Sequence, residues 1–95
     1  MNSLDEIKIL LSRNKQRLGQ ELKESKEAIS LIKKATNSNL SEDEIEKVKT
    51  QLLDICKAIP ALAVFLLPGG ALLLPLLIKL IPDILPSAFR EDNNE

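Results

Sequence analysis

The sequence predicts an all-α protein built around an apolar segment that prolines interrupt. One observation is that apolar residues recur at spacings of three, four and seven up to residue 59, which is typical of amphipathic helices. The other is an uncharged run of 21 residues from Ala58 to Ile78. We therefore expect two amphipathic helices at about 3–35 and 41–59, followed by a proline-broken apolar helix pair at about 61–67 and 71–81.

The first predicted helix begins with a capping box in which Ser3 and Glu6 exchange hydrogen bonds. Its apolar face is interrupted near Asn14 and at Ser25, and Gly19 is unfavourable inside a helix by about 1 kcal/mol relative to alanine. The sequence allows one long helix or two helices with a joint near Gly19. The apolar face consists of Leu4, Ile7, Leu11, Leu18, Leu22, Ile29 and Ile32.

This apolar face, over residues 4–32, has two interpretations that the sequence leaves open. It could be a zipper that joins a partner or a second copy of the chain, giving a homo-oligomer. It could equally pack against the chain's own apolar segment.

The second predicted helix starts at another capping box, formed by Ser41 and Glu44, with three acidic residues in its first turn. Pro60 ends or bends it. Cys56 is the single cysteine, which excludes an intramolecular disulfide, and its place on the apolar stripe indicates a small buried hydrophobe. The stripe consists of Ile45, Val48, Leu52, Ile55, Cys56 and Ile59.

The uncharged run is long enough to cross a bilayer as one helix, but Pro68, Gly69 and Gly70 break it in the middle. It could span in line, re-enter as a hairpin, or form a soluble core. Pro75 and Pro82 continue a spacing of seven from Pro68. Helical backbone there would leave carbonyls without donors at Val64, Ala71 and Ile78, and these could line a polar path in an assembly. Alternatively, the prolines only kink helices to fit a compact core.

Composition excludes several classes of function. Charges nearly balance, with 13 basic and 14 acidic residues, and histidine is absent, which leaves little scope for acid–base chemistry. The only aromatic residues are Phe65 and Phe89, which argues against base stacking on single-stranded nucleic acid. We expect no enzyme, cofactor, metal site, catalytic residue or DNA partner. We expect a cytoplasmic amphipathic helical region at 1–57, an apolar membrane-type segment broken by proline and glycine at 58–86, and an acidic flexible tail at 87–95.

From Glu21 onward, over about three quarters of its length, the chain resembles the Letm family, the leucine-zipper/EF-hand transmembrane proteins, and its Pro-Gly-Gly version is more similar to bacterial members. The resemblance is carried by the runs 24–28, 53–60, 65–70, 74–75, 79–82 and 84–89. It implies a membrane-associated α-helical protein linked to cation–proton exchange (K⁺/H⁺ or Ca²⁺/H⁺) or to ribosome attachment at the inner membrane. The large soluble domain that follows this segment in mitochondrial members, associated with ribosome binding, and the EF-hand are not found in this sequence. The candidate functional residues are Pro60, Pro68, Gly69, Gly70, Pro75, Lys79, Pro82, Asp83 and Pro86.

Two hypotheses follow for function. In the first, the chain is a bacterial inner-membrane protein in cation homeostasis, with its N-terminus in the cytoplasm, lipid as partner and Lys79 paired with Asp83 near the headgroups. In the second, it is a soluble or peripheral helical interaction module, ribosome-associated or homodimeric, that buries the apolar segment in its own fold.

Overall fold

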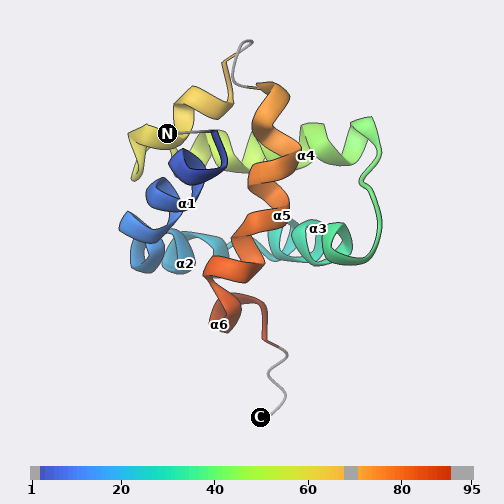
Figure 1. The fold of residues 1–95 in the computed structure, drawn as a ribbon. Helices are drawn as coiled ribbons and strands as arrows, with labels where there is room; N and C mark the ends of the chain where they lie inside the picture. The colour runs from blue at the N-terminus through green and yellow to red at the C-terminus, as the bar shows by residue number, and fades with distance from the viewer. Residues whose placement is uncertain (1–2, 68–70, 91–95) are drawn as a thin grey trace.

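The computed structural model describes residues 3–67 and 71–90, and every regular element within these ranges is helical (Figure 1). The predicted all-α class is therefore confirmed. The elements, in order, are α1 (Ser3–Arg13), α2 (Lys15–Lys23), α3 (Lys26–Asn37), α4 (Glu42–Ile55), the 3₁₀ helices η1 (Pro60–Phe65) and η2 (Ala71–Leu73), α5 (Leu74–Ile84) and the single turn α6 (Pro86–Phe89).

The predicted helix over 3–35 is in fact three helices, and neither break is at Gly19, which lies inside α2. The first break is at Asn14, whose side-chain Nδ2 donates to the Leu10 carbonyl at 2.9 Å. The second is at Ser25, whose Oγ accepts from the Ala28 amide at 3.2 Å and so caps a new helix. Both breaks fall where the apolar face is interrupted. The Ser3 side chain, on which the predicted capping box depends, lies outside what the structure describes.

Most of the apolar face of residues 4–32 is buried within the chain itself, and Leu4, at its start, is 37% exposed. Its members Ile7, Leu11, Leu18, Leu22 and Ile32 are all 0% exposed. These side chains are covered by the rest of the chain, so the fold agrees with intramolecular packing. The alternative of a zipper to a second copy gains no support.

Helix α4 begins as predicted and ends earlier. The Ser41 amide donates to Glu44 Oε1 at 2.9 Å and the Glu44 amide donates to Ser41 Oγ at 3.1 Å, which confirms the capping box. Val48, Leu52 and Ile55 form its buried stripe. Tight turns follow over residues 56–58, so the helix ends at Ile55 rather than at residue 59.

Helix α5 is the centre of the packing. It runs across the bundle between α1 and α3 (Figure 1) and buries one face completely. The buried residues recur at spacings of three and four, so a single stripe meets the N-terminal helices. They are Leu74, Leu77, Ile78 and Ile81, followed by Leu85 at the start of α6. This face of α5 is thus covered by the chain's own amphipathic helices.

The expected apolar helix pair has a different form. The segment predicted as helix 61–67 is the 3₁₀ helix η1, and the segment predicted at 71–81 is η2 followed by α5. Within the described ranges, each helix is either too short or too polar to cross a bilayer.

Most of the described prolines start helices instead of breaking them. Pro60, Pro75 and Pro86 occupy the first turns of η1, α5 and α6, where a backbone amide would have no helical partner. Pro82 alone among the described prolines lies inside a helix. The predicted row of three freed carbonyls is therefore wrong at the Pro75 position, and the part that depends on Pro68 lies outside the described residues.

Candidate functional site

Side-chain hydrogen bonds fix helix α3 against α4 at both ends. At one end Ser25 Oγ donates to Gln51 Oε1 at 2.9 Å, and Gln51 Nε2 donates to Glu27 Oε1 at 3.1 Å. At the other end Lys34 Nζ donates to Glu44 Oε2 at 2.5 Å. These hydrogen bonds therefore hold α3 in a defined position relative to α4, and α3 presents its outer face from that position.

The Lys34–Glu44 pair also sets the charge state of its acid. The hydrogen bond from the Lys34 ammonium, helped by the one from the Ser41 backbone amide, lowers the pKa of Glu44 below its ordinary value. Glu44 thus stays ionised at neutral pH and neutralises Lys34 locally.

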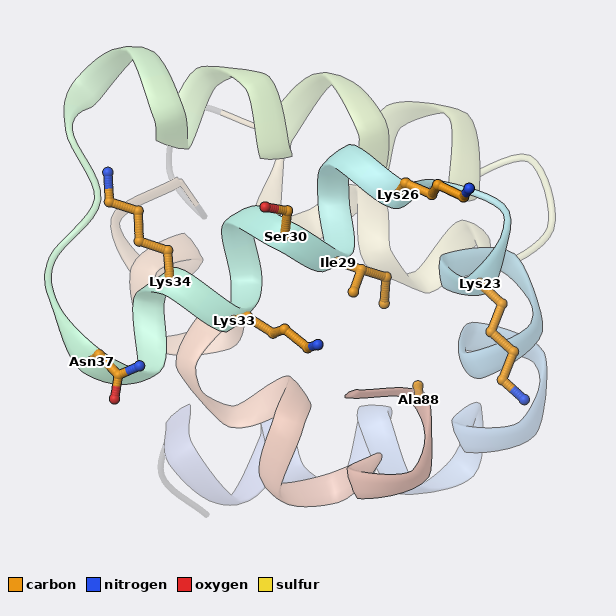
Figure 2. Close-up of a pocket in the computed structure, with 8 residues that line it drawn as sticks. All are labelled: Lys23, Lys26, Ile29, Ser30, Lys33, Lys34, Asn37 and Ala88. Carbon is orange, nitrogen blue, oxygen red and sulfur yellow. The ribbon is translucent and has the colours of Figure 1, made fainter. Parts of the chain in front are cut away.

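The outer face of α3 borders a groove of about 580 Å³, which we call the basic groove (Figure 2). The Lys33 side chain extends into the space between α3 and α6, where Ala88 faces it (Figure 2). None of the described lining residues is acidic. The lining residues are Lys23, Lys26, Ile29, Ser30, Lys33, Lys34, Asn37 and Ala88.

The chemistry of the basic groove is that of anion binding. Four lysines line this concave surface, of which Lys34 is paired with Glu44, and concave surfaces focus the field of such charges. Ser30 and Asn37 add neutral hydrogen-bonding groups. These side chains are suited to hold an anionic partner and carry no nucleophile–base pair.

Two of the described residues singled out from the sequence share a hollow. Pro75 and Lys79 line an apolar cleft of about 210 Å³, with Ala35, Asn39, Leu40, Ile45 and Ile78. Lys79 Nζ donates to Asn39 Oδ1 at 3.1 Å, so the expected pairing with Asp83 is replaced by a contact to the α3–α4 loop.

The other singled-out residues are scattered. Pro60, Asp83 and Pro86 are exposed, and Pro82 is half-buried. Pro68, Gly69 and Gly70 lie outside the described residues.

Sequence reasoning missed the basic groove because it considered the charge of residues 1–57 as a whole. A narrower window contains the information. Residues 13–34 hold seven basic residues (Arg13, Lys15, Arg17, Lys23, Lys26, Lys33 and Lys34) and three acidic ones (Glu21, Glu24 and Glu27), a net charge of +4. The periodicity of the apolar face, which places these residues outside the core, would have shown that they share the surface.

Comparison with known families gives one match. The family described as LETM1-like, RBD, the ribosome-binding domain, matches residues 40–95, which is more than half of the chain. The chain belongs to the LETM1-like family. Comparisons with curated proteins and with solved structures gave no match.

The matched region includes the proline-rich segment that we expected to be the membrane span, and with it the buried helix α5. The basic groove lies on this matched region only at Ala88, and its lysines come from α2 and α3, before residue 40.

Proposed function

We propose that this protein is a ribosome-associated binding module of the LETM1-like family. The observation that carries the proposal is the family match, whose description names ribosome binding and whose residues include the packed centre of the fold, α5. The basic groove supports it, because the ribosome presents a surface rich in phosphate, and lysines bind phosphate through charge.

The geometry suits a binding module because the groove is held by fixed helices. Helix α3 is tied to α4 through Ser25, Gln51 and Lys34, so the backbone that carries its lysines needs little reorganisation on binding. Preorganisation of this kind lowers the entropic cost of association.

Cosedimentation tests the proposal. The full chain is mixed with purified bacterial ribosomes and centrifuged through a sucrose cushion at low and at moderate salt. We expect it to pellet with ribosomes in a saturable manner, and to lose binding as salt rises because counterions compete for phosphate. A chain that stays in the supernatant at about 50 mM salt would contradict the proposal, because phosphate contacts are strongest there.

A second candidate function is cation–proton homeostasis at a bacterial inner membrane, with the N-terminus in the cytoplasm. The observation that favours it is exposed apolar surface in the predicted membrane-type segment. Val64, Leu67 and Leu72 are 52%, 59% and 85% exposed, and Leu72 lies in η2, just before α5. Exposed apolar patches are common where a protein meets lipid or another protein.

This second candidate is tested on expressed protein. A carbonate wash of cell membranes should leave the chain in the pellet, and vesicles containing it should exchange K⁺ or Ca²⁺ for protons. Protein that is released into the supernatant by carbonate and is monodisperse without detergent would exclude it.

A further inference from the structure

The basic groove continues into two further hollows. A second hollow of about 580 Å³ shares Lys23 and Ala88 with the basic groove, and a third of about 490 Å³ shares Arg13 with the second. Because the lining residues overlap, the three hollows form one path over α3, α2 and the end of α1. We call this path the basic track. Its basic residues are Arg13, Lys15, Arg17, Lys23, Lys26, Lys33 and Lys34.

The charged residues that line the described part of the basic track are all basic, and one of them, Lys34, is paired with Glu44. None of the described residues that line the three hollows is acidic, although the chain as a whole carries one more acidic than basic residue. Polar uncharged side chains, among them Gln16 and Gln20, fill the space between the basic ones. The track is thus a local concentration of positive charge on a protein of nearly balanced charge.

The length of the basic track fits a polymer of negative charges better than a single small anion. Lys26 and Lys33 are seven residues apart in α3, which is about 10 Å of helix, and Lys15 and Lys23 are about 12 Å apart along α2. Phosphates follow one another every ~3.4 Å of axis along each strand of a duplex. Several phosphates can therefore meet the track at the same time.

A flat anionic membrane fits the basic track less well than a rod does. The track is concave, and it contacts Ala88, beyond the C-terminal end of α5, where its first two hollows meet. Leu72, the most exposed of the large hydrophobic side chains that the structure describes, lies before the N-terminal end of the same helix. Eleven helical residues, about 16 Å, separate these two ends. A membrane-surface helix instead places basic and apolar residues side by side.

Duplex RNA suits the basic track better than single-stranded RNA. Proteins that bind single strands without base specificity stack bases on aromatic side chains. The two aromatic residues of this chain are Phe65, which is 5% exposed, and Phe89, which is packed against the core. No described lining residue of the three hollows is aromatic. Recognition of double-stranded RNA depends on shape and on backbone contacts, which lysine and arginine can supply.

We propose that the basic track binds the phosphate backbone of duplex RNA, without reading its sequence. The proposal rests on the proposed function, since the ribosome is the source of such RNA, and it names the part of the ribosome that is contacted. It assigns the contact to α1–α3, outside the residues matched by the family.

Fluorescence anisotropy with a labelled RNA duplex of about two helical turns tests the proposal. The full chain is compared with Lys23→Gln/Lys26→Gln, which removes two charges from the track, and with Lys47→Gln/Lys49→Gln, which removes two charges from α4. Both variants have the same net charge, and all four positions are on helices where glutamine is well tolerated. Circular dichroism of both variants checks that the helices form.

The expected result has two parts. The track variant should bind the duplex roughly 2- to 30-fold more weakly at low salt, the range that two exposed charge pairs span, while the control stays within about 2-fold of the parent. The slope of log K against log salt should fall by about one for each lysine removed in the track. Two duplexes of different sequence should bind equally well.

Other outcomes overturn the proposal and separate it from the proposed function. Equal weakening in both variants would mean that net charge alone drives binding, and tighter binding to anionic vesicles than to the duplex would assign the track to membranes. Ribosome pelleting that is unchanged in the track variant would keep the proposed function and remove the RNA contact. Duplex binding through the track, without ribosome pelleting of the parent chain, would keep the RNA contact and remove the proposed function.

Discussion

Gly19 of α2 lies directly against Leu85, the residue that joins α5 to α6. A Cβ built on Gly19 would lie 3.3 Å from Leu85 Cδ2. Leu85 is only 3% exposed, so its side chain has little room to move away. The glycine lets the C-terminal apolar segment approach α2 closely, and it thereby sets the wall of the second hollow of the basic track, which both residues line.

This contact predicts that the size of residue 19 limits stability. Gly19→Val should lower the free energy of unfolding by about 1–3 kcal/mol, because the branched side chain would overpack against Leu85. Gly19→Ala is the matched control. Its better helix propensity, worth about 1 kcal/mol, should offset much of the tight contact. Urea unfolding followed by circular dichroism measures both, and equal stabilities for the two variants would show that Leu85 moves away freely.

The capping box and ion pair at Glu44 predict a dependence of stability on pH. The pKa of Glu44 is lowered in the folded state, so its contribution is present above the unfolded pKa and is lost as pH falls through the folded pKa. The Tm of Glu44→Gln should lie below that of the parent chain at neutral pH, and the difference should shrink as pH falls below about 4.5. Lys57→Gln is the control for losing an exposed charge. Lys57 Nζ lies 4.0 Å from Asp54 Oδ1 at the surface, and exposed ion pairs of this kind contribute little to stability. A difference that stays constant down to about pH 2 would contradict the assignment.

The Cys56 thiol should react slowly in the folded chain. Burial raises the pKa of Cys56, because desolvation disfavours the thiolate, and the thiolate is the reactive form. A disulfide exchange reagent at mildly alkaline pH should therefore modify folded protein more slowly than the same protein in denaturant, where the thiol is exposed. Equal rates in the two conditions would show that the α4–η1 turn opens readily.

Sequence patterns predicted the fold correctly where a single local rule, such as capping or apolar spacing, determines the structure. The Ser41–Glu44 capping box and the stripe of Val48, Leu52 and Ile55 depend on local spacing, and both were predicted correctly. The breaks at Asn14 and Ser25 were visible as gaps in the apolar face, but Gly19 gave a stronger local indication of a joint. Its role depends on contact with Leu85, more than sixty residues away, and no local rule contains that contact.

The candidate site was harder to predict, because it depends on three helices coming together. The lysines of the basic groove are spread over 23–34, and they join Ala88 only through the packing of α5 between α1 and α3. The prolines, in contrast, drew attention through their regular spacing. Pro75 and Pro82 have different structural settings in spite of that spacing, since one begins α5 and the other lies within it.

This difference between Pro75 and Pro82 predicts opposite effects of the same substitution. Pro82→Ala should stabilise the chain by roughly 1–3 kcal/mol, because alanine restores an amide that can donate to the Ile78 carbonyl inside the helix. Pro75→Ala should be neutral or destabilise slightly, because a first-turn amide has no helical partner and proline restricts the unfolded chain. Thermal unfolding of both variants measures the contrast. A stabilisation of similar size at both positions would mean that α5 extends back through Pro75 in solution. Destabilisation by Pro82→Ala would mean that packing of the half-buried proline ring stabilises the chain by more than the missing hydrogen bond to the Ile78 carbonyl costs.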